Sequence, residues 1–133
     1  MRPAILIVDN DRHYLSMVRM FLENCGYAVQ CAACAEAALG LCADFRFAVV
    51  VTDLRIADDC DVDDCGGISL LKAIGTGCDA PRVIVHSGYL TWDFVRSAHA
   101  AGAVDFVGKS DGVERLLLSI RKALGEAPDR NSK

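Results

Sequence analysis

Residues 47–53 read FAVVVTD, the most hydrophobic of the strand-like runs in the chain, and they end on an acidic residue. The run has the length of a β-strand and is rich in β-branched residues. A strand without polar alternation is typical of a parallel sheet with helices on both faces, because neither face of such a strand meets water. We therefore expect Phe47–Thr52 to be the central strand of a parallel sheet, with Asp53 at its carboxyl end.

Similar short apolar runs lie on both sides of this stretch. The further strands that we predict are Ala4–Val8, Tyr27–Cys31, Arg82–His86 and Val104–Val107. Apolar residues recur at helical spacing after each strand, in residues 15–25, 35–42, 68–74, 90–101 and 113–124. Asp111 and Glu114 have the spacing of a capping box, which predicts the start of the last helix. This alternation predicts an α/β fold, a doubly wound (βα)5 parallel sheet in three layers.

The length of 133 residues suits one domain. We assign residues 1–124 to that domain and interpret the polar residues 125–133 as a tail or the start of a linker. No apolar run approaches the roughly 20 residues of a membrane-spanning helix, and acidic residues from Asp9 onward come too early for a secretory signal. We therefore expect a cytoplasmic protein. The net charge of −4 argues against nucleic-acid binding, which normally needs clustered basic residues.

The chain has seven cysteines, an odd number that excludes complete internal pairing. In the cytoplasm we expect most of them to be reduced, so we do not expect a disulfide between Cys60 and Cys65. Cys31 and Cys34 have the spacing of a redox motif. We do not expect this pair to open a helix at an active-site turn, as thioredoxin-type motifs do, and we do not assign it a redox function.

Polar residues follow four of the predicted strands. The first strand ends in Asp9-Asn10-Asp11, and the others are followed by Asp53, Ser87 and Lys109. Ligands of parallel sheets bind beyond the carboxyl ends of the strands, so we expect these side chains to share one site. Carboxylates do not cradle a phosphate directly, but they suit a hard cation such as Mg²⁺. A phosphoryl group would then be bound through the metal, Lys109 and the Ser87 hydroxyl.

Four segments together resemble the signature blocks of response-regulator receiver domains. They are ILIVDND (residues 5–11), VVVTDL (49–54), VIVHSG (83–88) and AGAVDFVGK (101–109). They occur in the family's order, and the resemblance covers the chain from Pro3 to Leu124. It implies a flavodoxin-like fold like that of the chemotaxis regulator, with strand order 2-1-3-4-5. It also implies a regulatory domain of two-component signalling that catalyses only its own phosphorylation and dephosphorylation.

The resemblance implies a role for each residue at the strand ends. Asp53 would accept phosphoryl from a sensor histidine kinase or a phosphotransfer protein, while Lys109 and Ser87 would contact the phosphoryl group. Mg²⁺, or Mn²⁺, would be held by Asp9, Asn10, Asp53 and the backbone carbonyl of Arg55. Ser87 and Phe106 would form the switch, and Arg55 and Tyr89 would modulate the lifetime of the acyl phosphate. The face formed by residues 90–101, 104–107 and 113–124 would bind an unknown output domain or protein partner, or a second copy of the chain.

The sequence departs from the family pattern at three places. Asn10 stands where a second acidic residue is usual, so we expect weaker metal binding. The loop from Asp53 to Gly67 is long and acidic, and it is either a solvated loop or a lid or partner-docking element. Ser110 replaces the usual proline after Lys109. Either that peptide is trans and Lys109 is aimed differently, or a strained cis bond persists despite its cost of roughly 2.5–4 kcal/mol.

Two functions remain open at this point. The favoured one is a phosphorylation-controlled switch of partner binding. The alternative is a degenerate receiver that acts as a phosphorylation-independent interaction or dimerisation module, which Asn10 and Ser110 motivate. A dehalogenase-type phosphatase is disfavoured by Arg55, where that class needs an aspartate.

Two further residues have structural interpretations. We expect Asp11 to cap a helix, and we expect His86 to lie in the core, facing away from Ser87.

Overall fold

The computed structural model describes residues 2–53, 70, 72–74, 80–88 and 91–125. Several sequence predictions lie outside these residues. They concern Arg55, Tyr89, the acidic loop with Cys60 and Cys65, and most of the polar tail.

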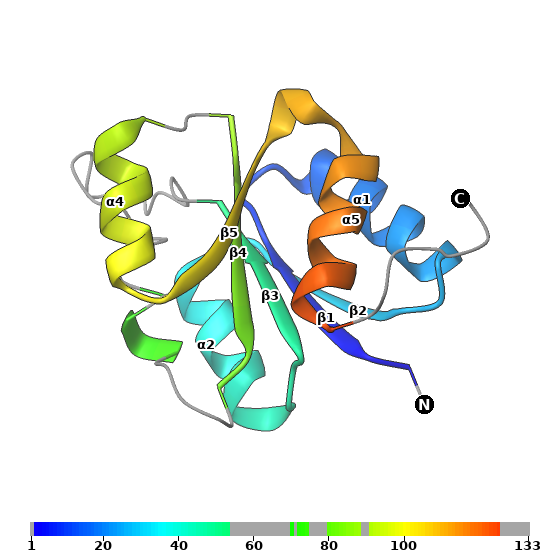
Figure 1. The fold of residues 1–133 in the computed structure, drawn as a ribbon. Helices are drawn as coiled ribbons and strands as arrows, with labels where there is room; N and C mark the ends of the chain where they lie inside the picture. Colours follow the sequence, from blue (N-terminus) through cyan, green and yellow to red (C-terminus); the bar gives the residue numbers. More distant parts are fainter. Residues whose placement is uncertain (1, 54–69, 71, 75–79, 89–90, 126–133) are drawn as a thin grey trace.

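Five parallel strands form one sheet in the order β2-β1-β3-β4-β5, as predicted (Figure 1). The strands are β1 (Ala4–Val8), β2 (Ala28–Ala32), β3 (Val49–Thr52), β4 (Arg82–Ser87) and β5 (Ala103–Gly108). All four residues of β3 are buried, and β3 lies between β1 and β4 in the middle of the sheet. The hydrophobic run that begins at Phe47 therefore contains the central strand, which starts at Val49, two residues later than predicted.

Helices cover both faces of the sheet, which gives the three predicted layers (Figure 1). The helices are α1 (Arg12–Asn24), α2 (Ala35–Asp44), α4 (Trp92–Ala100) and α5 (Val113–Ala123), and residues 70 and 72–74 are also helical. The helices α1 and α5 pack on one face, and α2 and α4 pack on the other. In the described part of the chain, no helix has the length and apolar character needed to span a membrane.

Strand alternation divides the apolar side chains between two cores, one on each face of the sheet. In β1, Leu6 and Val8 enter the core beneath α2 and α4, while Ile5 and Ile7 enter the core beneath α1 and α5. All four side chains are at most 2% exposed. The burial of apolar surface on both faces fixes the register of the strands, because a slip by one residue would exchange the two sets of side chains.

The starts of three helices show where local sequence signals succeed and fail. Asp11 caps α1 as predicted, since its carboxylate accepts hydrogen bonds from the backbone N–H groups of His13 and Tyr14. Cys34 is the N-cap of α2, whereas Cys31 lies in β2, so one cysteine of this pair lies at a helix start. The Cys34 sulfur accepts a hydrogen bond from the Ala37 N–H at 3.4 Å, a capping role that needs no redox chemistry.

The predicted capping box at Asp111 and Glu114 is wrong. A short 3₁₀ turn, Lys109–Asp111, precedes α5, and the N-cap of α5 is Gly112. The Asp111 carboxylate accepts a hydrogen bond from the Gly108 N–H at 3.0 Å and thus closes the turn behind Lys109. Gly112 has φ 91° and ψ 161°, a backbone conformation that essentially only glycine adopts.

The edge strand β5 contains a bulge. Val83 pairs with Ala103 and Ile84 pairs with Asp105, so Val104 is an extra residue without a partner in the register. The Val104 side chain is 47% exposed. Beyond the bulge the pairing resumes up to Ser87 and Gly108, which brings the ends of β4 and β5 side by side.

Candidate functional site

The carboxyl ends of β1, β3, β4 and β5 bring the predicted site residues to one edge of the sheet. Asp9 and Asp53 follow β1 and β3 directly and are 2% and 8% exposed. Their backbones are bound to the neighbouring strands, because Asp9 N–H donates to the Ala32 carbonyl at 3.0 Å and Asp53 N–H donates to the Val8 carbonyl at 3.1 Å. These hydrogen bonds fix the backbone positions from which the two carboxylate side chains extend.

Lys109 joins the two carboxylates. Its ammonium nitrogen lies 2.6 Å from Oδ2 of Asp9 and 3.0 Å from Oδ2 of Asp53. Partial burial by itself would lower the pKa of Lys109, but the hydrogen bonds and charges of Asp9 and Asp53 outweigh burial and raise that pKa above 10.5. Lys109 is therefore positively charged at neutral pH, and the two acidic groups share one counter-charge.

The structure has the trans alternative at the Lys109–Ser110 peptide. None of the peptide bonds among the described residues is cis. In this conformation the lysine still contacts both carboxylates, so proline after Lys109 is not required for that contact.

The residues that follow β1 are used in two ways. Asp9 Oδ1 accepts a hydrogen bond from the Asp11 N–H at 2.9 Å, which leaves its Oδ2 to face Lys109. Asp11 caps α1, as described above, and Asn10 between them is exposed. The first turn of α1 is thus built onto the same segment that supplies the site.

Ser87 and Phe106 lie on the adjacent strands β4 and β5. Ser87 is the last residue of β4 and is 2% exposed. Phe106 is half-buried, pairs with Val85 in the ladder and packs against the core beneath α2 and α4. The roles suggested for these two residues stay predictions, and Arg55 and Tyr89 lie outside the described residues.

Tyr14 contacts Lys109, and His86 contacts Tyr14, although the sequence pattern assigns neither residue to the site. The Lys109 ammonium lies 4.7 Å from the centroid of the Tyr14 ring. The Tyr14 hydroxyl is hydrogen-bonded to Nε2 of His86, and Nδ1 of His86 is hydrogen-bonded to the Val107 carbonyl at 3.0 Å. His86 is 2% exposed, which confirms the prediction that it lies in the core. The sequence feature that could have placed Tyr14 near the site is its position three residues after Asp11, in the first turn of the helix that Asp11 caps.

The donor set at this edge of the sheet fits a hard divalent cation. Asp9 and Asp53 present carboxylate oxygens around the Lys109 ammonium, and oxygen ligands are what Mg²⁺ prefers. Within the described ranges, no three His, Cys, Asp or Glu side chains form a group able to hold a metal. A metal here would need amide, carbonyl or water ligands as well, and Mg²⁺ commonly retains several waters.

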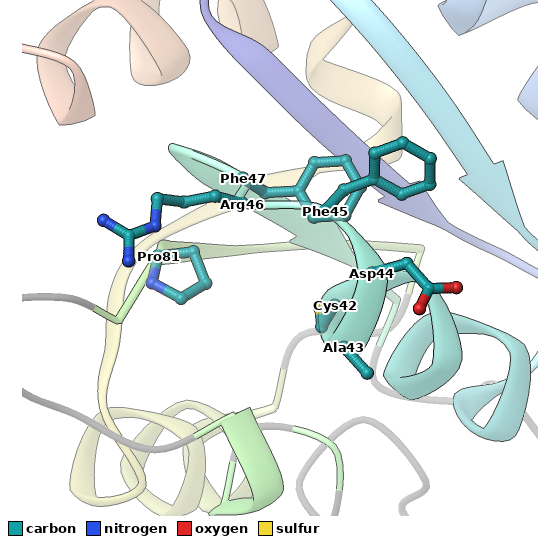
Figure 2. Close-up of a pocket in the computed structure, with 7 residues that line it drawn as sticks. All are labelled: Cys42, Ala43, Asp44, Phe45, Arg46, Phe47 and Pro81. Carbon is teal, nitrogen blue, oxygen red and sulfur yellow. The ribbon is translucent and has the colours of Figure 1, made fainter.

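A hollow of about 410 Å³ lies elsewhere on the molecule (Figure 2). It is lined by the end of α2, the segment before β3 and Pro81: Cys42, Ala43, Asp44, Phe45, Arg46, Phe47 and Pro81. These residues adjoin the amino end of β3, whereas Asp53 follows its carboxyl end. The hollow is therefore separate from the group of residues around Lys109.

The family model and the similar sequences point to the same protein family. The family model described as response regulator receiver domain matches residues 5–121. The C4-dicarboxylate transport transcriptional regulatory protein DctD of Rhizobium meliloti is 31% identical over 123 residues, which cover 91% of this chain and 25% of DctD. The transcriptional regulatory protein FixJ of the same organism is 33% identical over 136 residues, which cover 96% of this chain and 63% of FixJ. The chain thus spans less than two thirds of either relative.

Solved structures agree with the sequence comparison. A CheY-like receiver domain protein from Methanospirillum hungatei JF-1 superposes with a TM-score of 0.83 at 26% identity, covering 94% of this chain and 95% of that one. A response regulator protein from Burkholderia pseudomallei, solved with a phosphorylated aspartic acid, a calcium ion and citrate, has a TM-score of 0.75 at 25% identity. That match covers 94% of this chain and 75% of the other.

Proposed function

Because the chain belongs to the response regulator receiver domain family of two-component signalling, we propose that Asp53 accepts a phosphoryl group and thereby controls partner binding. The donor is a phosphohistidine of a sensor kinase or phosphotransfer protein in the cytoplasm. One observation carries the proposal: a charged lysine lies within 3.0 Å of carboxylate oxygens of both Asp9 and Asp53. A site for phosphoryl transfer needs this placement of charge more than it needs covalent chemistry.

In the proposed reaction an oxygen of the Asp53 carboxylate attacks phosphorus. The bond from phosphorus to the donor imidazole breaks, and its electron pair returns to the imidazole nitrogen, so the product is an acyl phosphate on Asp53. Negative charge on the transferred group would repel the acceptor carboxylate. Lys109 offsets that repulsion because its pKa is raised by Asp9 and Asp53, and it stays protonated throughout the physiological range.

Mg²⁺, or Mn²⁺, would be held by the carboxylates of Asp9 and Asp53, the Asn10 amide oxygen and the Arg55 backbone carbonyl. The bound cation would supply further positive charge to the phosphoryl oxygens. The oxygen donors of Asp9 and Asp53 support this assignment. So does the similar Burkholderia pseudomallei protein, which contains a phosphorylated aspartic acid and a calcium ion.

Ser87 and Phe106 would transmit the change. The Ser87 hydroxyl would hydrogen-bond a phosphoryl oxygen, and Phe106 would respond by packing, because its ring has no hydroxyl to bond with. The face made by α4, β5 and α5 would then bind the output domain, another protein or a second copy of the chain. Such a switch works only to the extent that the phosphoryl group favours one of the two forms. Arg55 and Tyr89 would modulate the lifetime of the acyl phosphate.

Acetyl phosphate with Mg²⁺ tests the proposal directly. We expect the intact mass to rise by one phosphoryl group in the wild type and not in Asp53→Asn. Asp44→Asn is the matched control, because Asp44 ends α2 near the other end of the sheet. Trp92, the first residue of α4, is 79% exposed and provides a fluorescence reporter of the α4–β5–α5 face.

The same experiment distinguishes phosphorylation of Asp53 from the competing function. A degenerate receiver that acts as a constitutive interaction or dimerisation module would show no mass change with acetyl phosphate. It would also show no change in Trp92 fluorescence with beryllofluoride and Mg²⁺. That pair of results would overturn the phosphorylation proposal and favour the alternative.

A further inference from the structure

Tyr14 and His86 come from different elements and meet beside Lys109. Tyr14 lies in the first turn of α1, and His86 is the residue before Ser87 in β4. Their rings are 5.6 Å apart between centroids, and a hydrogen bond joins the Tyr14 hydroxyl to Nε2 of His86. The pair is thus anchored in two layers of the fold, the helical layer and the sheet.

The hydrogen bonds fix the form of the imidazole. The Val107 carbonyl can only accept, so Nδ1 of His86 must carry the hydrogen and donate it across 3.0 Å. In a neutral ring Nε2 is then an acceptor, and the Tyr14 hydroxyl is the donor. Burial favours this neutral form because it lowers the pKa of His86 below 6.5. A proton on Nε2 would remove the acceptor that Tyr14 uses.

Tyr14 contacts Lys109 directly, whereas His86 is connected to Lys109 through the backbone of β5. Through space, the Tyr14 ring faces the ammonium at 4.7 Å, within the range of a cation–π contact. Through the chain, His86 binds the carbonyl of Val107, two residues before Lys109, and so ties β5 to β4 next to the site. The ammonium is then held by a ring and by the carboxylates of Asp9 and Asp53.

We propose that Tyr14 and His86 are positioning residues that hold the Lys109 ammonium in place for phosphoryl transfer to Asp53. This inference rests on the proposed function and assigns to it two side chains from outside the set of strand-end residues. A tyrosine that only filled the core would need neither a hydroxyl bonded to a buried histidine nor a ring facing the charged lysine. Misplacement of a charged group by about 1 Å can cost as much as ~100-fold in rate, so such support has a measurable effect.

Three variants separate the parts of this arrangement. Tyr14→Phe keeps the ring and removes the hydroxyl, His86→Leu removes the acceptor, and Tyr14→Leu removes the ring. Tyr27→Phe is the matched control, because Tyr27 is 4% exposed and belongs to the same core beneath α1 and α5. Two quantities are measured: the rate of phosphorylation by acetyl phosphate, and the NMR shifts of the Lys109 ε-methylene and ammonium groups in the unphosphorylated protein.

We expect Tyr14→Leu to lower the maximal phosphorylation rate by about tenfold, with the half-saturating donor concentration unchanged. The ring-current shift of the Lys109 ε-methylene should disappear in this variant. Tyr14→Phe and His86→Leu should each cause a smaller loss. Their combination should be no worse than His86→Leu alone, because His86→Leu already breaks the bond that Tyr14→Phe removes. Tyr27→Phe should match the wild type.

Unchanged Lys109 resonances in Tyr14→Leu would overturn the inference, as would fully additive losses from Tyr14→Phe and His86→Leu. If Tyr14→Leu does not fold, the Tyr14→Phe resonances and rates decide in its place. Absence of phosphorylation in the wild type would instead refute the proposed function. The Lys109 resonances would still decide whether Tyr14 and His86 position the lysine.

Discussion

Lys109 lies closer to Asp9 than to Asp53, with its ammonium nitrogen 2.6 Å from Oδ2 of Asp9 and 3.0 Å from Oδ2 of Asp53. The Asp9 side chain is 3% exposed, whereas that of Lys109 is 25% exposed. The lysine therefore compensates a carboxylate that water can scarcely reach. Breaking such a pair is costly because the charge that remains is buried without its partner.

Replacement of Lys109 by methionine should lower the free energy of unfolding at pH 7 by about 1–3 kcal/mol, less than for a fully buried pair because Lys109 is partly solvated. In an Asp53→Asn background the same replacement should cost less, since a single carboxylate then remains beside the methionine. Urea unfolding of the wild type, Lys109→Met, Asp53→Asn and the double variant measures the coupling between Lys109 and Asp53. Equal costs in the two backgrounds would show that Asp9 and Asp53 do not share the lysine.

Replacement of Asn10 by aspartate should strengthen Mg²⁺ binding by about tenfold, or ~1.4 kcal/mol, because a third negative charge joins Asp9 and Asp53. Without Mg²⁺ the added charge should lower the melting temperature. Calorimetric titration and thermal unfolding with and without Mg²⁺ measure the two effects. Asn24→Asp adds the same charge at the far end of α1 and is the control. Wild-type affinity equal to or tighter than that of the variant would contradict the prediction.

Stability should fall in mild acid because of His86. Burial and the charge of Lys109 lower the pKa of His86 below 6.5. The groups that raise this pKa, the Val107 carbonyl, Asp9 and Asp53, are outweighed. The Tyr14 hydroxyl is hydrogen-bonded to Nε2, the nitrogen that would take up the proton. As the pH falls below 6.5, the unfolded chain binds a proton that the folded chain does not, so the free energy of unfolding decreases. The decrease is at most about 1.4 kcal/mol per pH unit.

In His86→Leu this contribution is absent, so the curve of unfolding free energy against pH should be flatter between about pH 5 and pH 7. Urea unfolding across that range compares the slopes. His99→Gln removes an exposed imidazole from α4 and serves as the control. Parallel curves for the wild type and His86→Leu would be evidence against a neutral, buried His86.

Two glycines should respond to alanine in opposite directions. Gly112 has φ 91° and ψ 161°, so Gly112→Ala should destabilise the protein by about 1–3 kcal/mol although its Cβ would meet no atom. Gly40 lies inside α2 and is exposed, with open space around it. Gly40→Ala should stabilise by about 0.5–1 kcal/mol. Denaturant midpoints measure both changes, and a tolerated Gly112→Ala would contradict this account of the turn before α5.

Most of the fold could be predicted because its strands are buried on both faces. Runs such as Ala4–Val8 and Val49–Thr52 contain apolar side chains for two cores, and such runs have few other uses in a soluble α/β domain. Strand ends were harder to predict. Gly108 has little strand propensity, yet it extends β5 because Ser87 pairs with it.

Local signals failed where a competing interaction was stronger. The Asp111 carboxylate binds the Gly108 N–H and closes a 3₁₀ turn, so it does not cap α5. At the site, sequence reasoning could place Asp9, Asp53 and Lys109 together because the ends of parallel strands converge. It could not find Tyr14, whose contacts with His86 and Lys109 depend on how α1 packs against the sheet.

The bulge at Val104 determines what kind of association the outer edge of the sheet permits. An edge strand with a regular ladder is a template onto which a strand of another chain can add, and repeated addition leads to aggregates. In β5 the extra residue interrupts the regular spacing of N–H and C=O groups and increases the local twist. We therefore expect a molecule that binds the β5 edge to recognise side chains such as the exposed Val104, because the bulge disfavours backbone pairing between copies of the chain at this edge.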